Sequence, residues 1–382
     1  MEETDSLVED QQNKEVLTWK SGVTQIFHAA VGAGVIGLSE APSVLGWPLS
    51  LFLLWGFGIL SSFTSIYLGS QEKNSLREAV YEHGGNPASY IATFVTSTNA
   101  FSTNIMNIVL IGQLLKPYNN VLPDIWFRII AGIIAGSWAI RYTEMKKFRL
   151  AGIIGVISTI VLVGGMLTTP IGHDCVGHPP AISMFAAFTN IALSMQHHAT
   201  SSTIGGSLKN KKQFMIAEFV AMSGVLLTYT IVMIVGALCI GAGEFGNPLV
   251  SITGPLYIVI VICVVLMEIS AFPIVATAGR NNILDSLKLS HDSKWRYIIA
   301  VGWPSLAVII AVVIPKFEVV ASAMGFLASF NMFTLPGMSL LGEGNTYSSW
   351  KKRIFGLILI LIGLSVSGVA LVSAIIAFKS NK

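Results

Sequence analysis

The sequence predicts an all-α polytopic membrane protein with about eleven transmembrane helices, and two observations lead to that prediction. Only 11% of the 382 residues are charged and 53% are hydrophobic, with a mean hydropathy of +0.70, whereas a soluble protein of this size carries about 25% charged residues. The few charges also separate long uncharged stretches, and a helix needs roughly 20 apolar residues to cross a bilayer. The net charge of +3 gives no support for nucleic-acid binding, because the charges lie between these stretches.

Eleven long stretches with at most one Lys, Arg, Asp or Glu residue each follow one another along the chain. They are expected at residues 21–39, 41–71, 84–115, 125–140, 150–171, 175–208, 214–243, 248–279, 297–315, 319–341 and 354–378. Gly46, Trp47 and Pro48 mark the start of the second helix, because Pro is favoured in a first turn and Trp at a membrane interface. Arg128 lies near the start of the fourth stretch and counts against that helix.

The basic residues predict how these helices are oriented. With eleven crossings and a cytoplasmic N-terminus, 18 of the 23 Lys and Arg residues fall on the cytoplasmic side. This excess is what the positive-inside rule requires, and one miscounted helix would scramble it. The acidic segment 1–19 lacks the basic start and short apolar core of a cleaved signal peptide. We therefore expect it to be a cytoplasmic tail.

Two of the expected helices contain runs of residues that form helices poorly. The first has Gly32, Gly34 and Gly37 in its middle, and each glycine costs a helix about 1 kcal/mol relative to alanine. The sixth contains the largely polar stretch 196–203 and then two more glycines. Such interruptions are tolerated in a bilayer where they line a cavity or hold a ligand, although glycines also let helices pack closely. Because the two helices are five apart, the pattern favours a solute site between two five-helix halves.

Several segments resemble the amino acid/auxin permease family. The resemblance rests on Val-Gly-Ala-Gly-Val-Ile-Gly-Leu at 31–38 with Leu-Gly-Trp-Pro at 45–48, on Gln-His-His at 196–198, on Phe-Pro at 272–273 and on Phe-Thr-Leu-Pro at 333–336. It implies secondary active transport of amino acids. It also implies a leucine-transporter-like (LeuT) fold, in which two inverted five-helix repeats, here 20–172 and 173–342, precede a last helix within 343–382.

The sequence departs from this family at two places. Leu38, Ser39 and Glu40 stand where the family usually has Leu-Pro-Tyr, so the exit from the first helix differs. His28 stands where the sodium-coupled neutral amino acid branch tends to have asparagine. The second departure puts sodium coupling in doubt.

The interrupted helices supply the groups that an amino acid needs. Freed amides at the start of a half-helix attract a carboxylate, and freed carbonyls on the facing segment suit the amine. Asn104 and Asn107 share a helical face that we expect to point into the bundle, where an ordinary interhelical hydrogen bond is the alternative role. The residues expected to bind substrate are Val31, Gly32, Ala33, Gly34, Asn104, Ser194, Gln196, His197 and His198.

Ionisable side chains at membrane depth are candidates for coupling transport to an ion, because they are costly there otherwise. The sequence places His28, His197, His198 and Glu268 at that depth. Histidine titrates near neutrality and can carry a proton. Glu268 precedes Ser270 on the eighth helix, which the resemblance places beside the first helix at the cation site. We therefore expect His28, Glu268 and Ser270 to couple transport to protons, with sodium as the alternative ion and structural roles for His28 and Glu268 as the competing interpretation.

Other classes of protein fit the sequence less well. No nucleophile–base pair or metal-ligand spacing points to an enzyme or a cofactor, and no repeated charged filter points to a channel. A sensor of the same fold that binds amino acids but transports little is a further alternative, and a tail shorter than 20 residues favours transport. We expect a monomer in the plasma membrane or in a vacuolar or lysosomal membrane, with an amino acid and lipid as its partners. Cys175 and Cys239 fall on one predicted side, where a disulfide is conceivable.

Overall fold

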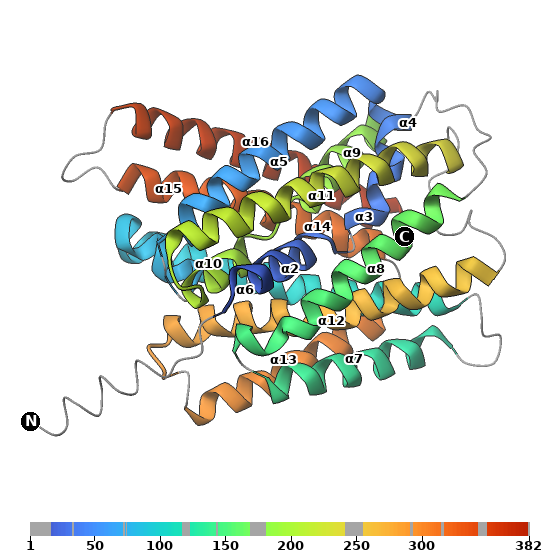
Figure 1. The fold of residues 1–382 in the computed structure, drawn as a ribbon. Coiled ribbons are helices and arrows are strands. Elements are labelled where there is room, and N and C mark those ends of the chain that lie inside the picture. Colours follow the sequence, from blue (N-terminus) through green and yellow to red (C-terminus); the bar gives the residue numbers. More distant parts are fainter. Residues whose placement is uncertain are drawn as a thin grey trace, which may run out of the picture.

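The computed structural model describes residues 17–32, 34–71, 73, 75–116, 123–142, 144–168, 181–240, 255–290, 293–314, 317–342 and 350–380. Within these ranges the chain forms helices that lie side by side as a bundle, with α2 and α12 near its middle (Figure 1). Most of the expected acidic tail, and Cys175 of the conceivable disulfide, lie outside the described residues.

The first part of the chain builds the helices that surround α2. Their bounds are α2 (Trp19–Ala30), α3 (Gly34–Gly37), the 3-10 helix η1 (Leu38–Glu40), α4 (Ala41–Leu45), α5 (Trp47–Gly69), α6 (Leu76–Leu115), α7 (Asp124–Arg141), the 3-10 helix η3 (Met145–Phe148) and α8 (Arg149–Leu167). The helix expected over 84–115 begins earlier than its uncharged stretch, at Leu76, because Ser75 caps it by accepting a hydrogen bond from the Glu78 amide. A kink at Gly85, where φ is 68°, separates this charged first portion from the rest of α6.

The second part of the chain begins with another pair of short helices. Its elements are α9 (Ala181–Ser194), α10 (His198–Ser207), α11 (Lys211–Ile240), α12 (Pro255–Ser286), α13 (Lys294–Val313), α14 (Phe317–Ser329), the π-helix η5 (Phe330–Thr334), α15 (Leu335–Gly342) and α16 (Trp350–Ser380). Seven helices of the described chain are long and apolar enough to cross a membrane, by length and composition alone.

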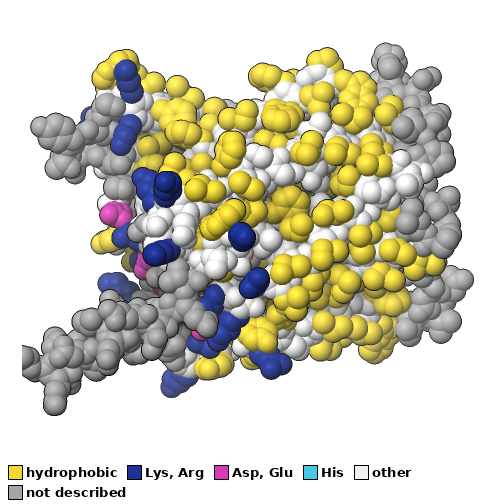
Figure 2. Space-filling view, viewed as in Figure 1, with side chains coloured by type: hydrophobic (Ala, Val, Ile, Leu, Met, Phe, Trp, Pro, Cys, Tyr) yellow, Lys and Arg dark blue, Asp and Glu magenta, His cyan; other side chains and the backbone are white. Residues whose placement is uncertain are grey.

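The outer surface of the bundle is apolar where a soluble protein would be polar. Phe52, Phe94, Phe219 and Val313 are each at least 69% exposed, and hydrophobic side chains cover most of the face drawn in Figure 2. The Lys and Arg side chains on that face gather toward one end of the bundle. Exposed apolar surface of this extent marks contact with lipid or another apolar partner.

Arg128 stabilises α7 rather than opposing it. Its guanidinium is 2% exposed and donates to Asp124 Oδ2 at 2.7 Å, one turn earlier on the same helix. It also donates to the carbonyl oxygens of Ala311 (2.6 Å) and Ile314 (2.5 Å). These carbonyls belong to the C-terminal end of α13, which lacks further turns to satisfy them. The charged residue near the start of α7 is therefore a tether between two helices.

Candidate functional site

The first helix interruption lies between α2, which ends at Ala30, and α3, which begins at Gly34. The backbone turns there through hydrogen bonds from Val31 N to Phe27 O (2.8 Å), from Gly32 N to Ala30 O (3.1 Å) and from Val35 N to Gly32 O (3.0 Å). Tyr229 of α11 donates its hydroxyl to Ala30 O at 2.6 Å. The carbonyl at the end of α2, which helix geometry leaves without its usual partner, thus accepts one hydrogen bond from the following backbone and one from a neighbouring helix.

Two of the three glycines near this interruption are required by close packing against α9. A Cβ atom at Gly34 would lie 2.6 Å from Ser194 Oγ and 2.8 Å from Ser194 Cα, and one at Gly37 would lie 2.9 Å from Asn190 Nδ2. Ser194 Oγ also donates to Gly34 O at 3.0 Å. Gly32 differs, because a Cβ atom there would meet nothing within 4 Å. Close helix packing and an opening in the backbone therefore occur within the same motif.

The second interruption lies at residues 195–197, between α9 and α10. Met195 N and Gln196 N still donate to Ala192 O (3.2 Å) and Leu193 O (3.1 Å), and the carbonyl of His197 then accepts the first hydrogen bonds of α10. The carbonyl of Met195 accepts two side-chain hydrogen bonds, one from Ser61 Oγ of α5 at 2.7 Å and one from His197 Nδ1 at 3.0 Å.

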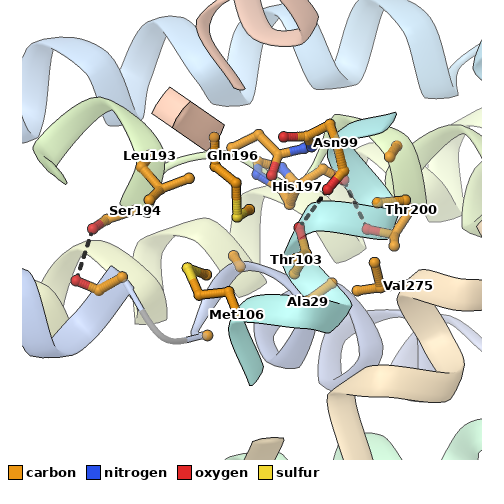
Figure 3. A pocket seen from close by; sticks show the side chains of 16 residues that line it. Ala29, Asn99, Thr103, Met106, Leu193, Ser194, Gln196, His197, Thr200 and Val275 are labelled. Atoms are coloured by element: carbon orange, nitrogen blue, oxygen red, sulfur yellow. Dashed lines mark hydrogen bonds between the residues drawn. The ribbon is translucent and has the colours of Figure 1, made fainter. Parts of the chain in front are cut away.

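A cavity opens where the two interruptions approach each other and α6 (Figure 3). Five of the residues predicted to bind substrate line it: Gly32, Gly34, Ser194, Gln196 and His197. The wall also contains Met106, Leu193, Val275 and Met324 as larger apolar side chains and Asn99, Thr103 and Thr200 as polar ones. The cavity is thus bounded by exposed backbone on one side and by mixed polar and apolar side chains on the others.

The other predicted substrate residues lie elsewhere. Val31 and Asn104 are fully buried outside the lining of this cavity, and His198 turns away to pair its Nε2 with Thr64 Oγ1 at 2.8 Å. Ala33 lies outside the described residues. The face of α6 that lines the cavity is the one that carries Asn99 and Thr103, which are one turn apart and which the sequence analysis does not single out.

A buried pair of ionisable groups borders the cavity. Nε2 of His197 lies 2.6 Å from Oε1 of Glu218 on α11, and both side chains are 0% exposed. The sequence-based list of ionisable groups at membrane depth is therefore incomplete, since it omits Glu218. The available signal is a carboxylate at the fifth residue of the largely apolar stretch that begins at Phe214, although a carboxylate so close to the end of a helix is equally well explained by solvent exposure there.

The three residues predicted to couple transport to an ion form two contacts between helices. His28 of α2 is fully buried, and its Nε2 lies 2.9 Å from Ser270 Oγ of α12. A Cβ atom on Gly155 of α8 would overlap the His28 ring, so α8 supplies the space that this ring fills. Glu268 is also fully buried, and the Asn107 side-chain amide, turned so that its nitrogen faces the acceptors, donates to Glu268 Oε2 at 2.9 Å. In the described part of the chain no group of three or more His, Cys, Asp or Glu residues is placed to hold a metal ion.

Comparison with known proteins identifies relatives over nearly the whole chain. A family model described as "Transmembrane amino acid transporter protein" matches residues 15–378. The sodium-coupled neutral amino acid transporter 7 of Xenopus laevis is 23% identical over 402 aligned residues, which cover 92% of this chain and 88% of that protein. A relative from Xenopus tropicalis is 28% identical over 173 residues, which cover 42% of this chain and 39% of its own length. Among solved structures, that of MhsT in complex with L-phenylalanine superposes with a TM-score of 0.64 at 12% identity, over 93% of this chain and 98% of the other.

Proposed function

The chain belongs to the transmembrane amino acid transporter protein family, and on this premise we propose that it carries an amino acid across a membrane by secondary active transport with alternating access. It is a multi-pass membrane protein with a leucine-transporter-like fold, and a transporter rather than an enzyme. The proposal assigns the substrate to the cavity between the two helix interruptions and takes the proton as the coupling ion.

The observation that supports this assignment is the convergence of both interruptions on one cavity. Gly32 faces open space, so its backbone can approach a ligand without an intervening side chain. Backbone N–H groups at the start of a helix have no partner within that helix, and they attract anions. We assign the substrate carboxylate to the backbone around Gly32 and Gly34.

The amine and the side chain of the substrate then face the remaining walls. Met195 O already accepts hydrogen bonds from Ser61 and His197, so the amine is assigned to the carbonyl oxygens of Ser194 and Gln196 instead. Met106 and Val275 offer an apolar wall to the substrate side chain. An uncharged side chain suits such a wall, because a buried charge without a partner is costly.

Proton coupling is supported by two buried groups, each of which can take up or release a proton. Ser270 Oγ donates to Met267 O at 3.0 Å and therefore accepts from His28 Nε2, which leaves His28 Nδ1 as the ring nitrogen without hydrogen. This nitrogen has no hydrogen-bond partner among the described residues. Glu268 has no cationic partner within them either, and a buried carboxyl group without one favours its protonated form. We assign coupling to His28, Glu268 and Ser270.

Sodium is the alternative coupling ion, because the Xenopus laevis relative is named a sodium-coupled neutral amino acid transporter. In transporters of this kind, unwound backbone carbonyls coordinate sodium. Here two of the oxygen atoms at the end of α2 and on the facing turn of α12 are already engaged, since Ala30 O accepts from Tyr229 and Ser270 Oγ pairs with His28. These contacts support the proton over sodium.

Uptake into proteoliposomes tests the proposal directly. The purified chain is reconstituted and supplied with labelled neutral amino acids under an inward proton gradient or an inward sodium gradient. Accumulation driven by the proton gradient and indifferent to sodium is expected. Sodium dependence without pH dependence would overturn the proton assignment, and binding without accumulation under either gradient would favour a sensor.

A glycine pair supplies the matched variants for this assay. Gly34→Leu should abolish uptake while leaving membrane insertion intact, because the new side chain must displace Ser194. Gly164→Leu on α8 should leave uptake unchanged, since a Cβ atom at Gly164 meets nothing within 4 Å. Full uptake by Gly34→Leu would show that the substrate does not bind at the assigned site.

The proposal includes an arrangement in the membrane. We assign eleven crossings, with α2 and α3 together as the first, α9 and α10 as the sixth and α16 as the eleventh, and two inverted five-helix repeats in a monomer of the plasma or a vacuolar or lysosomal membrane. The basic side chains gathered at one end of the bundle support a cytoplasmic N-terminus on that side (Figure 2). In a background without the natural cysteines, Lys211→Cys and Lys116→Cys should react with an impermeant thiol reagent from opposite sides of the membrane.

A further inference from the structure

The hydrogen bonds of His197 determine how many protons its pair with Glu218 holds. Nδ1 faces the carbonyl oxygen of Met195 at 3.0 Å, and a carbonyl only accepts, so Nδ1 carries a hydrogen. Nε2 faces Glu218 Oε1 at 2.6 Å, a distance that requires one hydrogen between the two atoms. The pair therefore contains one shared proton and is neutral overall, whether that proton is written on the ring or on the carboxyl group.

The groups around the pair do not offer a substitute for this proton. The ring of His198 lies 5.2 Å from that of His197, centre to centre. Thr64 Oγ1 donates to backbone oxygens of α5 and so accepts from His198 Nε2, while His198 Nδ1 has no hydrogen-bond partner among the described residues. A second hydrogen on this ring would be a buried charge without a partner, which is costly, so we treat His198 as a neutral neighbour. On the other elements packed against α10 and α11, His28 of α2 pairs with Ser270, and Glu268 of α12 faces Asn107. The remaining described titratable or charged side chains on the elements packed against α10 and α11 are Lys20 of α2, Glu40 of η1, Tyr67 of α5, Arg77, Glu78, Tyr81, Glu82 and Tyr90 of α6, Lys146 and Lys147 of η3, Arg149 of α8, Lys211, Lys212 and Tyr229 of α11, and Tyr257, Cys263, Arg280 and Asp285 of α12.

Loss of the shared proton would alter the cavity. A carboxylate oxygen would then face the bare Nε2 atom across a contact of hydrogen-bond length, and the two lone pairs repel. A net negative charge would also remain fully buried, which is costly without a partner. His197 directly precedes α10 as its N-cap residue and lines the cavity, and its carbonyl oxygen accepts from Thr200 Oγ1 at 2.7 Å (Figure 3). Separation of His197 from α11 therefore moves the cavity wall itself.

We infer that the proton shared by His197 and Glu218 must be present for the amino acid to bind, so that this pair links proton binding to substrate binding in addition to His28 and Glu268. The inference rests on the proposed function. Because such linkage is reciprocal, the bound amino acid retains the proton, and one proton is taken up per amino acid when binding occurs above the pH at which the pair titrates. Both are released together when the cavity opens to the less acidic side. Glu218 is in this account a positioning residue that acts through His197.

Equilibrium binding to the purified full chain tests the inference without any gradient. Binding of tritiated L-alanine, L-leucine and L-glutamine is measured from about pH 5 to about pH 9. For the unaltered chain, the dissociation constant should rise about tenfold per pH unit above the titration of the pair, as for one linked proton. In Glu218→Gln, the amide N–H donates to the bare Nε2 atom while Nδ1 keeps its bond to Met195 O. This variant needs no shared proton, so its affinity should be independent of pH.

The adjacent histidine supplies the matched control. His198→Asn should retain the pH dependence, because its ring is not part of the pair. The inference is overturned if Glu218→Gln keeps the slope of the unaltered chain, or if His198→Asn loses it while Glu218→Gln does not. If Glu218→Gln does not fold, Glu218→Asp replaces it: a carboxylate that reaches less far should move the midpoint of the pH profile, and an unmoved midpoint contradicts the inference.

Two results with the unaltered chain separate this inference from the proposed function. Tight binding that does not change with pH overturns the role of the pair and leaves amino acid transport standing. No binding of any amino acid at any pH overturns the transporter proposal, and the role of the pair with it. A purely structural contact between α10 and α11 would change the stability of Glu218→Gln without changing its pH profile.

Discussion

The hydroxyl group of Tyr229 donates a 2.6 Å hydrogen bond to the carbonyl oxygen of Ala30, the last residue of α2. Tyr229 is fully buried on α11, and Ala30 lines the cavity. One side chain thus fixes the end of α2 at the point where its helix stops. The Gly32 amide donates to the same oxygen atom, so the Tyr229 hydroxyl is its second donor and the one that comes from another helix.

We predict that Tyr229→Phe weakens substrate binding about fivefold, which corresponds to the loss of one buried hydrogen bond of about 1 kcal/mol. The ring remains, so packing is retained, while the end of α2 gains alternative positions that do not bind. Equilibrium binding of the labelled amino acid measures the effect. Thr230→Val on the next residue is the control, because its hydroxyl donates to Leu226 O within α11 rather than to α2. Equal affinities for the two variants would contradict the prediction.

We predict that Gly34→Ala destabilises the protein and lowers uptake, whereas Gly32→Ala leaves the fold intact. A Cβ atom at Gly34 would lie 2.8 Å from the backbone of Ser194, which cannot move without moving α9, but a Cβ atom at Gly32 has open space. Overpacking of this kind costs about 1–3 kcal/mol. Thermal unfolding in detergent separates the two variants. If Gly34→Ala were as stable as Gly32→Ala, the contact between α3 and α9 would be able to adjust to the added methyl group, and the prediction would be wrong.

Gly32 and Gly34 show which features of the site can be predicted from the sequence and which cannot. The pattern of small residues predicts an interruption near residue 32; in the structure α2 ends at Ala30 and α3 begins at Gly34. Likewise Gly46, at φ 77°, and Pro48 mark the start of α5 where the sequence predicts it. Such features are local, since they follow from the conformations available to glycine and proline. Which glycine packs and which opens onto a cavity depends on α9, which is distant in sequence.

The cavity wall is harder to predict for the same reason. Asn99, Thr103, Asn104 and Asn107 place polar groups around much of α6, so its sequence alone does not say which face meets the interruptions. The structure turns Asn99 and Thr103 to the cavity and Asn107 to Glu268. The sequence does not predict the role of Tyr229, because a tyrosine in an apolar helix is usually a core packing residue. Long-range partners decide these roles.

We predict that Gly155→Ala impairs the His28 site while leaving α8 helical. Its methyl group would overlap the His28 ring, which is held between α8 and Ser270 of α12. The ring must then leave Ser270, so proton-driven accumulation should fall about tenfold or more, whereas binding at the cavity should change less. Uptake under an imposed proton gradient, compared with equilibrium binding, measures the difference. Gly164→Ala on the same helix is the control, and an equal effect of both substitutions would count against a specific role for His28.

We predict that Arg128→Leu lowers the stability of the protein by about 3 kcal/mol, because it removes charged hydrogen bonds to both α13 and Asp124 from a buried position. Arg128→Lys should lose less, since an ammonium group keeps the charge but cannot reach two carbonyls and a carboxylate in the same planar geometry. Unfolding monitored by size-exclusion chromatography after heating orders the variants. Arg149→Leu, an exposed position on α8, should match the unaltered chain. If Arg128→Leu proved as stable as Arg149→Leu, the tether between α7 and α13 would contribute nothing to the stability of the protein.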